Sequence, residues 1–473
     1  MEKLLKKFFE EEIRNYSLAV IEARAIPSVI DGLKPSQRKV LCEGFKIWSG
    51  SNKEPLKVYQ FCGSVAKNMN YVHGDASLNA CITTMCQTFQ NPYTLLKGDG
   101  QFGSLRVKEA GSPRYVGCSL SEIARVLYKD SDLCETRVEE GKAVEPYVYY
   151  PILPVLLLNG STGIATGFAS NILPFDIKNV VDSCKSYIKS VKDGKKWKNK
   201  IEITPYIPQW RGTVVKNQEP DKRTGLIKEN KWDFLGAYHI DPKAKVRKGY
   251  VEVVIDEFSK DKEYDAYEKV LNDLVSNNDN YLSWNSDKVG TDTVYRVVIK
   301  DEYISDKSKD EKIRKELCLD SSETLNLSTI DETGKLRIFD TVDDIIRYFC
   351  DYRLKVYDVI IPKRIKELES RDIVLKNKVK FITEKNLDKV LKDKKKAEVE
   401  EYLEKNKYDK VDGSYAYILS MNFLNRTKEK ADEMVAQMEE LDKELQKLKA
   451  SNKYDLFIDA IDEAYSVLKK QVI

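Results

Sequence analysis

A heptad pattern in the last third of the chain narrows the possible folds more than any other feature. Ala431, Met434, Met438, Leu441, Leu445 and Leu448 follow one another at steps of 3, 4, 3, 4 and 3 residues. A first, weaker heptad comprises Leu354, Ile361, Ile365, Leu368, Leu375, Val379 and Ile382, with Asp372 as its polar interruption. Such spacing favours helices that pack along a narrow apolar seam. The pair predicts an antiparallel helical hairpin with a small knob at its far end; two ordinary amphipathic helices in a bundle are the alternative.

The first two thirds of the chain show shorter elements. Several short helices are expected before residue 90, one of them capped by Ser36, and a glycine-rich, hairpin-like stretch follows them. This order is typical of a helix-turn-helix or winged-helix module. Farther along, β-rich runs at Pro151–Leu158, Gly212–Val215 and Tyr250–Ile255 alternate with turn residues. We therefore expect a mixed α/β domain in the middle of the chain.

Composition excludes several classes of protein. The nine cysteines include no C-x-x-C pair, so a disulfide framework or a zinc cluster is not expected. Two histidines are too few for a mechanism that needs several imidazoles. No apolar run approaches the roughly 20 residues of a membrane helix, and no secretory signal is present. An intracellular, cytoplasmic protein (in the host cell, if the source is a phage or virus) is the resulting expectation.

Positive charge is concentrated near the N-terminus. Residues 21–128 contain 13 Lys and Arg against 8 Asp and Glu, whereas the whole chain is only +3. The imbalance indicates a polyanion site, although a chance fluctuation explains it equally well. Cations near turns could reach a phosphate backbone; these are Arg24, Lys34, Arg38, Lys39 and Arg114. The G-x-G-x-x-G match at 98–103 lacks the following helix of a dinucleotide site, so nucleotide binding is not expected there.

Several motifs resemble the breakage-reunion region of type IIA DNA topoisomerases, nearer the eukaryotic than the gyrase form. They occur in family order and cover nearly the whole chain. They are IPSVIDGLKPSQRKVL (26–41), YVHGDASL (71–78), GDGQFGS (98–104), GSPRYVG (111–117), LLLNGSTGIATGF (156–168) and TIDETGKLRIFDTVDDIIRYFCDYR (329–353). Nothing resembles the family's ATPase or Toprim domains. The organisation is most like the medium subunit of T-even-type phage topoisomerases; a fragment of a single-chain viral or eukaryotic enzyme is the alternative.

The resemblance implies a role for each matching residue. Tyr115 would be the nucleophile that forms a 5′-phosphotyrosyl bond, with Arg114 and His73 stabilising charge on the phosphate. Residues that would hold the DNA backbone are Arg24, Lys34, Tyr71 and Ser77, and Ile164 would wedge between base pairs. The resemblance also implies Mg²⁺ and ATP bound by an ATPase/Toprim partner subunit, and no metal or cofactor bound by this chain.

The expected fold class is a multidomain α+β protein. It would combine a winged-helix DNA-binding domain, a mixed α/β tower, and an antiparallel coiled-coil arm with a small helical C-gate domain. A homodimer would form through the C-gate and winged-helix interfaces. The expected boundaries are an N-terminal helix (1–20), winged helix (21–138), tower (139–342), first arm helix (343–385), C-gate region (386–423) and return helix (424–473). The resemblance predicts ATP-dependent relaxation and decatenation of duplex DNA. A non-enzymatic architectural DNA-binding protein with a dimerising coiled coil is the competing function.

Overall fold

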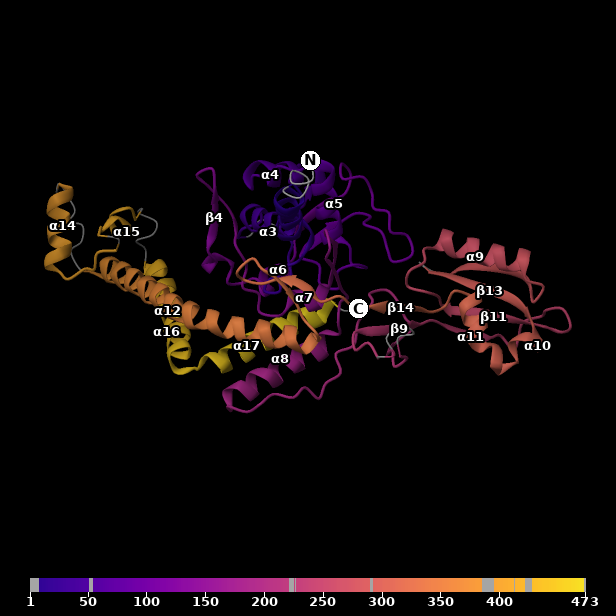
Figure 1. Cartoon of the computed structure of the whole chain (residues 1–473). Helices are drawn as coiled ribbons and strands as arrows, with labels where there is room; N and C mark the ends of the chain where they lie inside the picture. Colours follow the sequence, from indigo (N-terminus) through magenta and orange to yellow (C-terminus); the bar gives the residue numbers. More distant parts are fainter. Residues whose placement is uncertain are drawn as a thin grey trace. The chain divides into compact units, whose positions relative to one another are not determined.

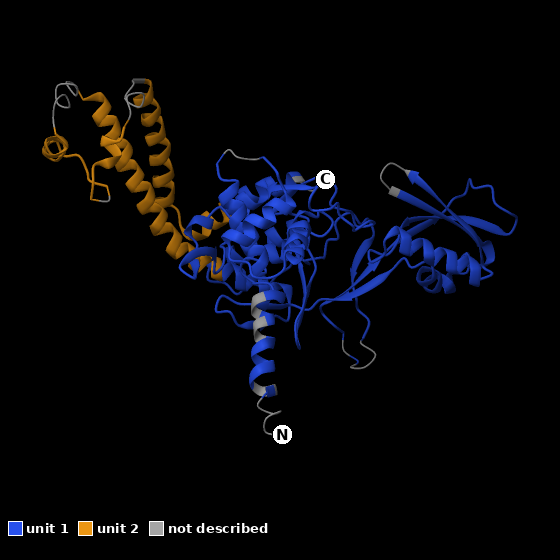
Figure 2. Ribbon diagram, turned by 90° about the horizontal axis from the view of Figure 1, so that it is seen from above, with its two compact units in different colours: residues 1–351, 460–473 blue, residues 352–459 orange. Residues whose placement is uncertain are grey.

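The computed structural model describes residues 8–50, 54–220, 225, 227–289, 292–384, 395–411, 413–421 and 428–471. The chain forms two compact units, residues 1–351 with 460–473, and residues 352–459 (Figure 2). Each unit is treated separately below. None of the helices within the described ranges is long and apolar enough to cross a membrane.

The first unit begins with helical turns that lead into a helical and β-rich body. Its helical elements up to residue 127 are η1 (Phe8–Ile13), α2 (Arg14–Val20), η2 (Ile21–Ala25), α3 (Pro35–Ile47), α4 (Val58–Asn68), α5 (Asp75–Cys86) and α6 (Glu122–Leu127). Three short strands form an antiparallel sheet in the order β1-β3-β2, namely β1 (Leu56–Lys57), β2 (Leu96–Asp99) and β3 (Gly117–Leu120). Helices α3, α4 and α5 contact one another, and α3 and α5 also contact this sheet. No helix follows residues 98–103, as expected.

The start of α3 differs from the sequence prediction. Pro35 is the first residue of the helix, and Lys34, not Ser36, occupies the N-cap position. The backbone N–H of Lys34 donates to the side chain of Gln37, at 2.9 Å. Proline suits the first helical position because its missing N–H would have no partner there. The helix therefore begins one residue before the predicted cap, with Lys34 on the preceding loop.

The prediction of a β-rich run at Pro151–Leu158 is wrong. Residues from Val155 onward form a short helix, α7 (Val155–Asn159), and its side chains from Val155 to Leu158 are buried. A short continuous apolar run fits a buried helix as well as a strand, so periodicity could not separate the two. The hairpin β6 (Ser161–Ile164) and β7 (Ala169–Ile172) follows, and then α8 (Ile177–Lys192).

The middle of the chain is mixed α/β, as expected. Three antiparallel strands form one sheet in the order β14-β9-β8, and four form another in the order β10-β11-β13-β12. Their bounds are β8 (Thr213–Lys216), β9 (Lys231–Leu235), β10 (Ala237–Ile240), β11 (Tyr250–Glu257), β12 (Tyr281–Val289), β13 (Asp292–Lys300) and β14 (Ser321–Thr324). Helix α9 (Tyr264–Asn277) packs on the four-stranded sheet through Tyr267 and Leu271, with α10 (Asp301–Ile304) and α11 (Asp310–Glu316) nearby (Figure 1). The remaining hairpins are β4 (Thr136–Glu139) with β5 (Lys142–Pro146), and β15 (Ser328–Ile330) with β16 (Leu336–Ile338).

The second unit contains the predicted helical hairpin. Helix α12 (Val342–Thr383) enters it and α16 (Lys428–Ala450) returns, followed by α17 (Lys453–Leu468) (Figure 2). Lys449 pairs with Glu369, and Lys453 with Asp358, so the two chain segments run antiparallel. The second heptad is confirmed, because all six of its apolar positions are buried or half-buried, whereas most of the residues between them are exposed.

A small separate core lies at the end of the hairpin. Helices α14 (Lys396–Lys405) and α15 (Ala416–Leu419) contribute Leu403 and Ile418, which pack with Phe381 at the end of α12. The knob predicted from the sequence therefore has its own apolar cluster. The proposed domain boundaries at 385–386 and 423–424 fall at residues outside the described ranges.

Candidate active site

Tyr115 lies on a tight loop between β2 and β3, and its side chain is 72% exposed. Its backbone N–H donates to Ser112 O at 2.8 Å, which closes a turn around Pro113 and Arg114. The loop is anchored on the start of α4, because Tyr59 N donates to Pro113 O at 3.0 Å. Lys57 Nζ also donates to the carbonyl oxygen of Tyr115, at 2.6 Å. A fixed backbone thus presents a free-standing phenol to solvent.

A cavity of about 560 Å³ separates this loop from α5. Arg114 lines it on the loop side, and Asp75, Ala76 and Ala80 line it on the helix side. Tyr59 is also in its wall, with 58% of the residue exposed. The cavity is open to solvent and shallow enough for a backbone phosphate to enter between Arg114 and the first turns of α5. A phosphate there would be close to a cation and to the loop that carries Tyr115.

Three of the predicted backbone-holding residues converge with His73, although the four residues come from three segments. Tyr71 forms a side-chain hydrogen bond with Ser77 and lies within electrostatic reach of Arg24. Burial raises the pKa of Tyr71, while the Ser77 hydrogen bond and the Arg24 charge oppose that rise. His73 stands edge-on to Tyr71, with ring centroids 5.4 Å apart. Arg24, His73 and Ser77 are exposed, so this group can accept a polyanion from solvent.

Lys34 connects this group to the hairpin that carries Ile164. Its Nζ donates to Thr162 O in β6 at 2.7 Å, and burial lowers its pKa. Gly163 packs so closely on the preceding loop that a Cβ there would lie 2.0 Å from Ala25 O. Ile164, the next residue, is 88% exposed, which is unusual for a large aliphatic side chain in a firmly held hairpin. The geometry suits a side chain that inserts into another molecule.

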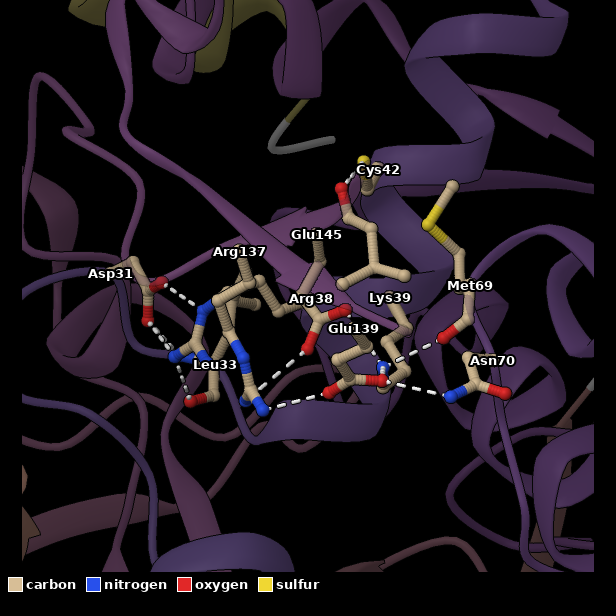
Figure 3. A network of polar contacts seen from close by, with 11 residues as sticks. Asp31, Leu33, Arg38, Lys39, Cys42, Met69, Asn70, Arg137, Glu139 and Glu145 are labelled. Carbon is tan, nitrogen blue, oxygen red and sulfur yellow. Dashed lines mark hydrogen bonds and ion pairs between the residues drawn. The ribbon is translucent and has the colours of Figure 1, made fainter. Parts of the chain in front are cut away.

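Arg38 is buried and Lys39 is half-buried, and both already pair with carboxylates of the protein. Arg38 is buried, and its Nε and Nη2 donate to the two carboxylate oxygens of Asp31 at 2.7 and 3.1 Å (Figure 3). Lys39 Nζ donates to Met69 O at 2.7 Å and pairs with Glu145 at 2.8 Å. Both cations are therefore engaged inside the protein, and we assign them structural roles in place of DNA contacts.

In the described part of a single chain, Tyr115 and Arg114 are not connected to His73. Within the described ranges, no hydrogen bond or ion pair joins the side chain of Tyr115 or Arg114 to the Tyr71–His73 group. The structure of one chain thus holds two exposed surfaces, the Tyr115 loop with α5 and the group around Tyr71. No cluster of three or more His, Cys, Asp and Glu side chains suited to a metal ion occurs in the described part of the chain.

The fold is that of the DNA-binding and cleavage region of type II topoisomerases. The crystal structure of the Plasmodium falciparum topoisomerase II DNA-binding, cleavage and re-ligation domain superposes with a TM-score of 0.80 and 26% identity, over 97% of this chain and 64% of that one. The chain belongs to the DNA gyrase/topoisomerase IV A-subunit family, whose model matches residues 24–464.

Two curated relatives illustrate the range of the family. The DNA topoisomerase medium subunit of Enterobacteria phage T4 is 30% identical over 370 residues, which are 77% of both chains. The DNA topoisomerase 2 of Invertebrate iridescent virus 6 is 26% identical over 97% of this chain. The chain spans only 38% of that viral protein, so the larger proteins contain regions with no counterpart here.

Proposed function

We propose that this chain performs the DNA breakage and reunion steps of a type II topoisomerase. The observation that carries the proposal is Tyr115, an exposed phenol on an anchored loop, next to Arg114, which faces α5 across a cavity. Family membership over residues 24–464 supports the same reaction. ATP hydrolysis and the Toprim acids would belong to a partner polypeptide; the name of the T4 medium subunit implies that its enzyme has other subunits.

The chemistry follows from the properties of a phenol. The Tyr115 oxygen attacks the phosphorus of a DNA phosphodiester, forming an O–P bond as the P–O3′ bond breaks. The phenol loses its proton, the 3′-oxygen gains one, and the DNA 5′-phosphate remains attached to the protein. Because no water consumes the new ester, the 3′-hydroxyl can reverse the step and reseal the strand. An ordinary phenol, with a pKa near 10, needs activation at neutral pH.

Other residues of the chain assist at stated positions. Arg114 would neutralise the phosphoryl oxygens from the neighbouring position on the loop. Arg24, Lys34, Tyr71 and Ser77 would hold the DNA backbone, and His73 would add a hydrogen bond or charge there. Ile164 would open a base step at a cost of a few kcal/mol and so bend the duplex. Mg²⁺, supplied with the partner, adds charge stabilisation.

The helical hairpin of the second unit would serve as a dimer contact. Two copies are needed because each chain offers one Tyr115, whereas a double-strand break needs two nucleophiles. The small core around Leu403 and Ile418 would lie at that contact and form the C-gate. Passage of a second duplex through the break would then relax or decatenate DNA.

A covalent adduct tests the proposal directly. The chain is incubated with duplex DNA labelled at its 3′ ends, Mg²⁺ and an ATPase/Toprim polypeptide, then denatured and separated by gel electrophoresis. We expect a protein–DNA adduct that Tyr115→Phe abolishes while duplex affinity changes by less than about twofold, because no positive charge is lost. Tyr59→Phe is the matched control, since Tyr59 is exposed in the same cavity. An adduct that survives Tyr115→Phe, or no adduct at all, would favour the architectural DNA-binding alternative or another nucleophile.

A further inference from the structure

A short segment around α8 carries more positive charge than the whole chain. Residues 178–200 contain eight lysines and two aspartates, with no arginine or glutamate. Their net charge is therefore +6, whereas the chain totals +3, so everything outside the segment is net negative. Lysines at such density repel one another and are retained at a cost in stability unless a polyanion binds them.

The helix arranges half of these lysines in one row. Counted from Lys178, the next lysines of the row follow at 7, 11 and 14 positions, as Lys185, Lys189 and Lys192. At about 100° per residue, the four side chains fall within an arc of roughly 60° around the helix axis. The opposite face of α8 is buried through residues such as Val180, Cys184 and Ile188. The row is about 21 Å long at 1.5 Å per residue.

The other lysines lie on a loop that is fixed beside the helix. Trp197 is buried against Tyr187 of α8, with ring centroids 5.1 Å apart, and its Nε1 donates to Ser186 Oγ at 3.2 Å. Asn199 Nδ2 donates to Ser183 Oγ at 3.2 Å and to Asp343 Oδ1 at 2.8 Å. These anchors alternate with exposed lysines, so the loop adds Lys195, Lys196, Lys198 and Lys200 to the surface.

Few of these charges are neutralised inside the protein. Lys185 pairs with Asp462, and Lys195 with Asp193 at 2.9 Å. Lys178, Lys189, Lys196, Lys198 and Lys200 are exposed and form no ion pair within the described ranges. We refer to these five residues as the α8 lysine surface. It is preorganised, because the helix and the anchored loop set the positions of its Cα atoms before any ligand binds.

We propose that the α8 lysine surface binds duplex DNA through its phosphates, as a second DNA site distinct from the Tyr115 loop. The proposal rests on the proposed function, which brings two duplexes to the enzyme. A protein partner fits less well, because protein interfaces have an apolar centre. Residues 178–200 include no exposed large hydrophobic side chain, and their one tryptophan is buried. Phosphate binding needs charge alone.

The position and the length of the surface agree with this assignment. Helix α8 packs on α7, and the backbone of α7 at Leu156 lies directly against Gly32, where a Cβ would be 2.5 Å from Leu156 N. Buried α7 therefore packs both on α8 and on the loop that precedes Lys34. Along a duplex, the 21 Å row would face about six base pairs, with one phosphate charge per roughly 1.7 Å of axis. About twelve phosphates on the two strands lie along that length, and the five lysines of the surface could neutralise roughly five of them without reading sequence.

Lysine footprinting tests the site in the intact chain. The Tyr115→Phe protein is acetylated with and without excess duplex of about 30 base pairs, and modification is quantified by mass spectrometry. We expect acetylation of Lys189, Lys196, Lys198 and Lys200 to slow at least threefold with DNA. Exposed lysines of the second unit serve as internal controls and should react at unchanged rates; these are Lys363, Lys366, Lys405 and Lys443. Equal rates at the α8 lysine surface with and without DNA would overturn the proposal.

A charge variant supplies the second measurement. Changing Lys189, Lys196, Lys198 and Lys200 to Gln should lower the salt slope for binding a second duplex by about 3 to 4, at roughly 0.9 for each lost phosphate contact. The control changes the four second-unit lysines to Gln, which removes the same charge. Adduct formation at Tyr115 with the partner should stay within about twofold of wild type, so this arm reports separately on the proposed function. An unchanged salt slope in the charge variant, or loss of its adduct, would contradict a separate DNA site. In the footprinting experiment, protection of these lysines by the partner polypeptide instead of DNA would identify a protein contact and overturn the proposal.

Discussion

The buried pair between Arg38 and Asp31 gives the most decisive prediction for a single residue. The Asp31 carboxylate is fully buried and accepts two bonds from Arg38, one from Leu33 N at 3.0 Å and one from Tyr149 N at 3.1 Å. Arg38 also donates to Leu33 O, at 3.3 Å. Burial opposes the charged form of Arg38, but the charge and hydrogen bond of Asp31, together with the smaller effects of Glu145 and Tyr149, outweigh it, and the pKa of Arg38 is raised. The pair fixes the loop before α3 to the body of the first unit.

Arg38→Met should destabilise the protein strongly without touching a DNA contact. The variant leaves a buried carboxylate with two backbone donors and no counter-charge. Removing one partner of a buried pair typically costs about 3–5 kcal/mol. Adding Asp31→Asn to Arg38→Met should recover at least half of that loss, because the amide oxygen still accepts from backbone and no charge remains buried.

Amide hydrogen exchange in α3 is the most local readout. A loss of about 3–5 kcal/mol corresponds to a rise of roughly 10² to 10³-fold or more in the exchange of its slowest amides, at 1.4 kcal/mol per tenfold. Arg24→Met is the control, since it removes the same charge from an exposed side chain. It should leave exchange in α3 unchanged and lower the salt slope of duplex binding by about 0.9. The opposite pattern, with normal exchange in Arg38→Met but a reduced salt slope, would show that Arg38 contacts phosphate after all.

Three further predictions concern the hairpin and the Tyr115 loop. Ile164→Ala should reduce DNA bending, measured by fluorescence transfer between duplex ends, while affinity for a pre-nicked duplex stays within about threefold; an unchanged bend would assign Ile164 to packing. Gly163→Ala should displace the hairpin, because a Cβ would lie 2.0 Å from Ala25 O, and should lower the midpoint of thermal unfolding or the bend; a variant with neither effect would contradict the close approach. Arg106→Leu removes a buried partner of Glu257 and a cation 3.6 Å above the Phe258 ring, so it should cost about 3–5 kcal/mol in unfolding free energy and slow adduct formation; normal stability in denaturant titration would refute that structural role.

Sequence periodicity determined the second unit of this protein well. A heptad is a local property, because the same apolar positions recur every seven residues along one helix. The apolar stripe that results needs only a similar stripe on another helix to pack against. The prediction therefore survived although α12 contains Pro362 and the return segment is divided between α16 and α17. The loop around Tyr115 is likewise determined mainly by nearby sequence. It is closed by residues within four positions of the tyrosine and by the neighbouring β1 and α4.

Counting charges over wide windows concealed a second feature. The basic excess of residues 21–128 drew attention to the N-terminal part, while the remaining chain averaged to near neutrality. The eight lysines of residues 178–200 were visible in the sequence but were diluted by acidic residues elsewhere. A window of about 20 residues would have found them, although not the arrangement of helix row and anchored loop.

Only the tertiary structure decided which cations face solvent. Arg24, Lys34, Arg38 and Lys39 look alike in sequence, each near a turn and each able to reach a phosphate. Asp31 lies seven residues before Arg38, but Glu145 approaches Lys39 from more than 100 residues away, and no local pattern specifies that contact. A long charged side chain goes wherever a partner and enough burial make the pairing favourable. Its role is therefore fixed by chain segments that meet only in the folded state.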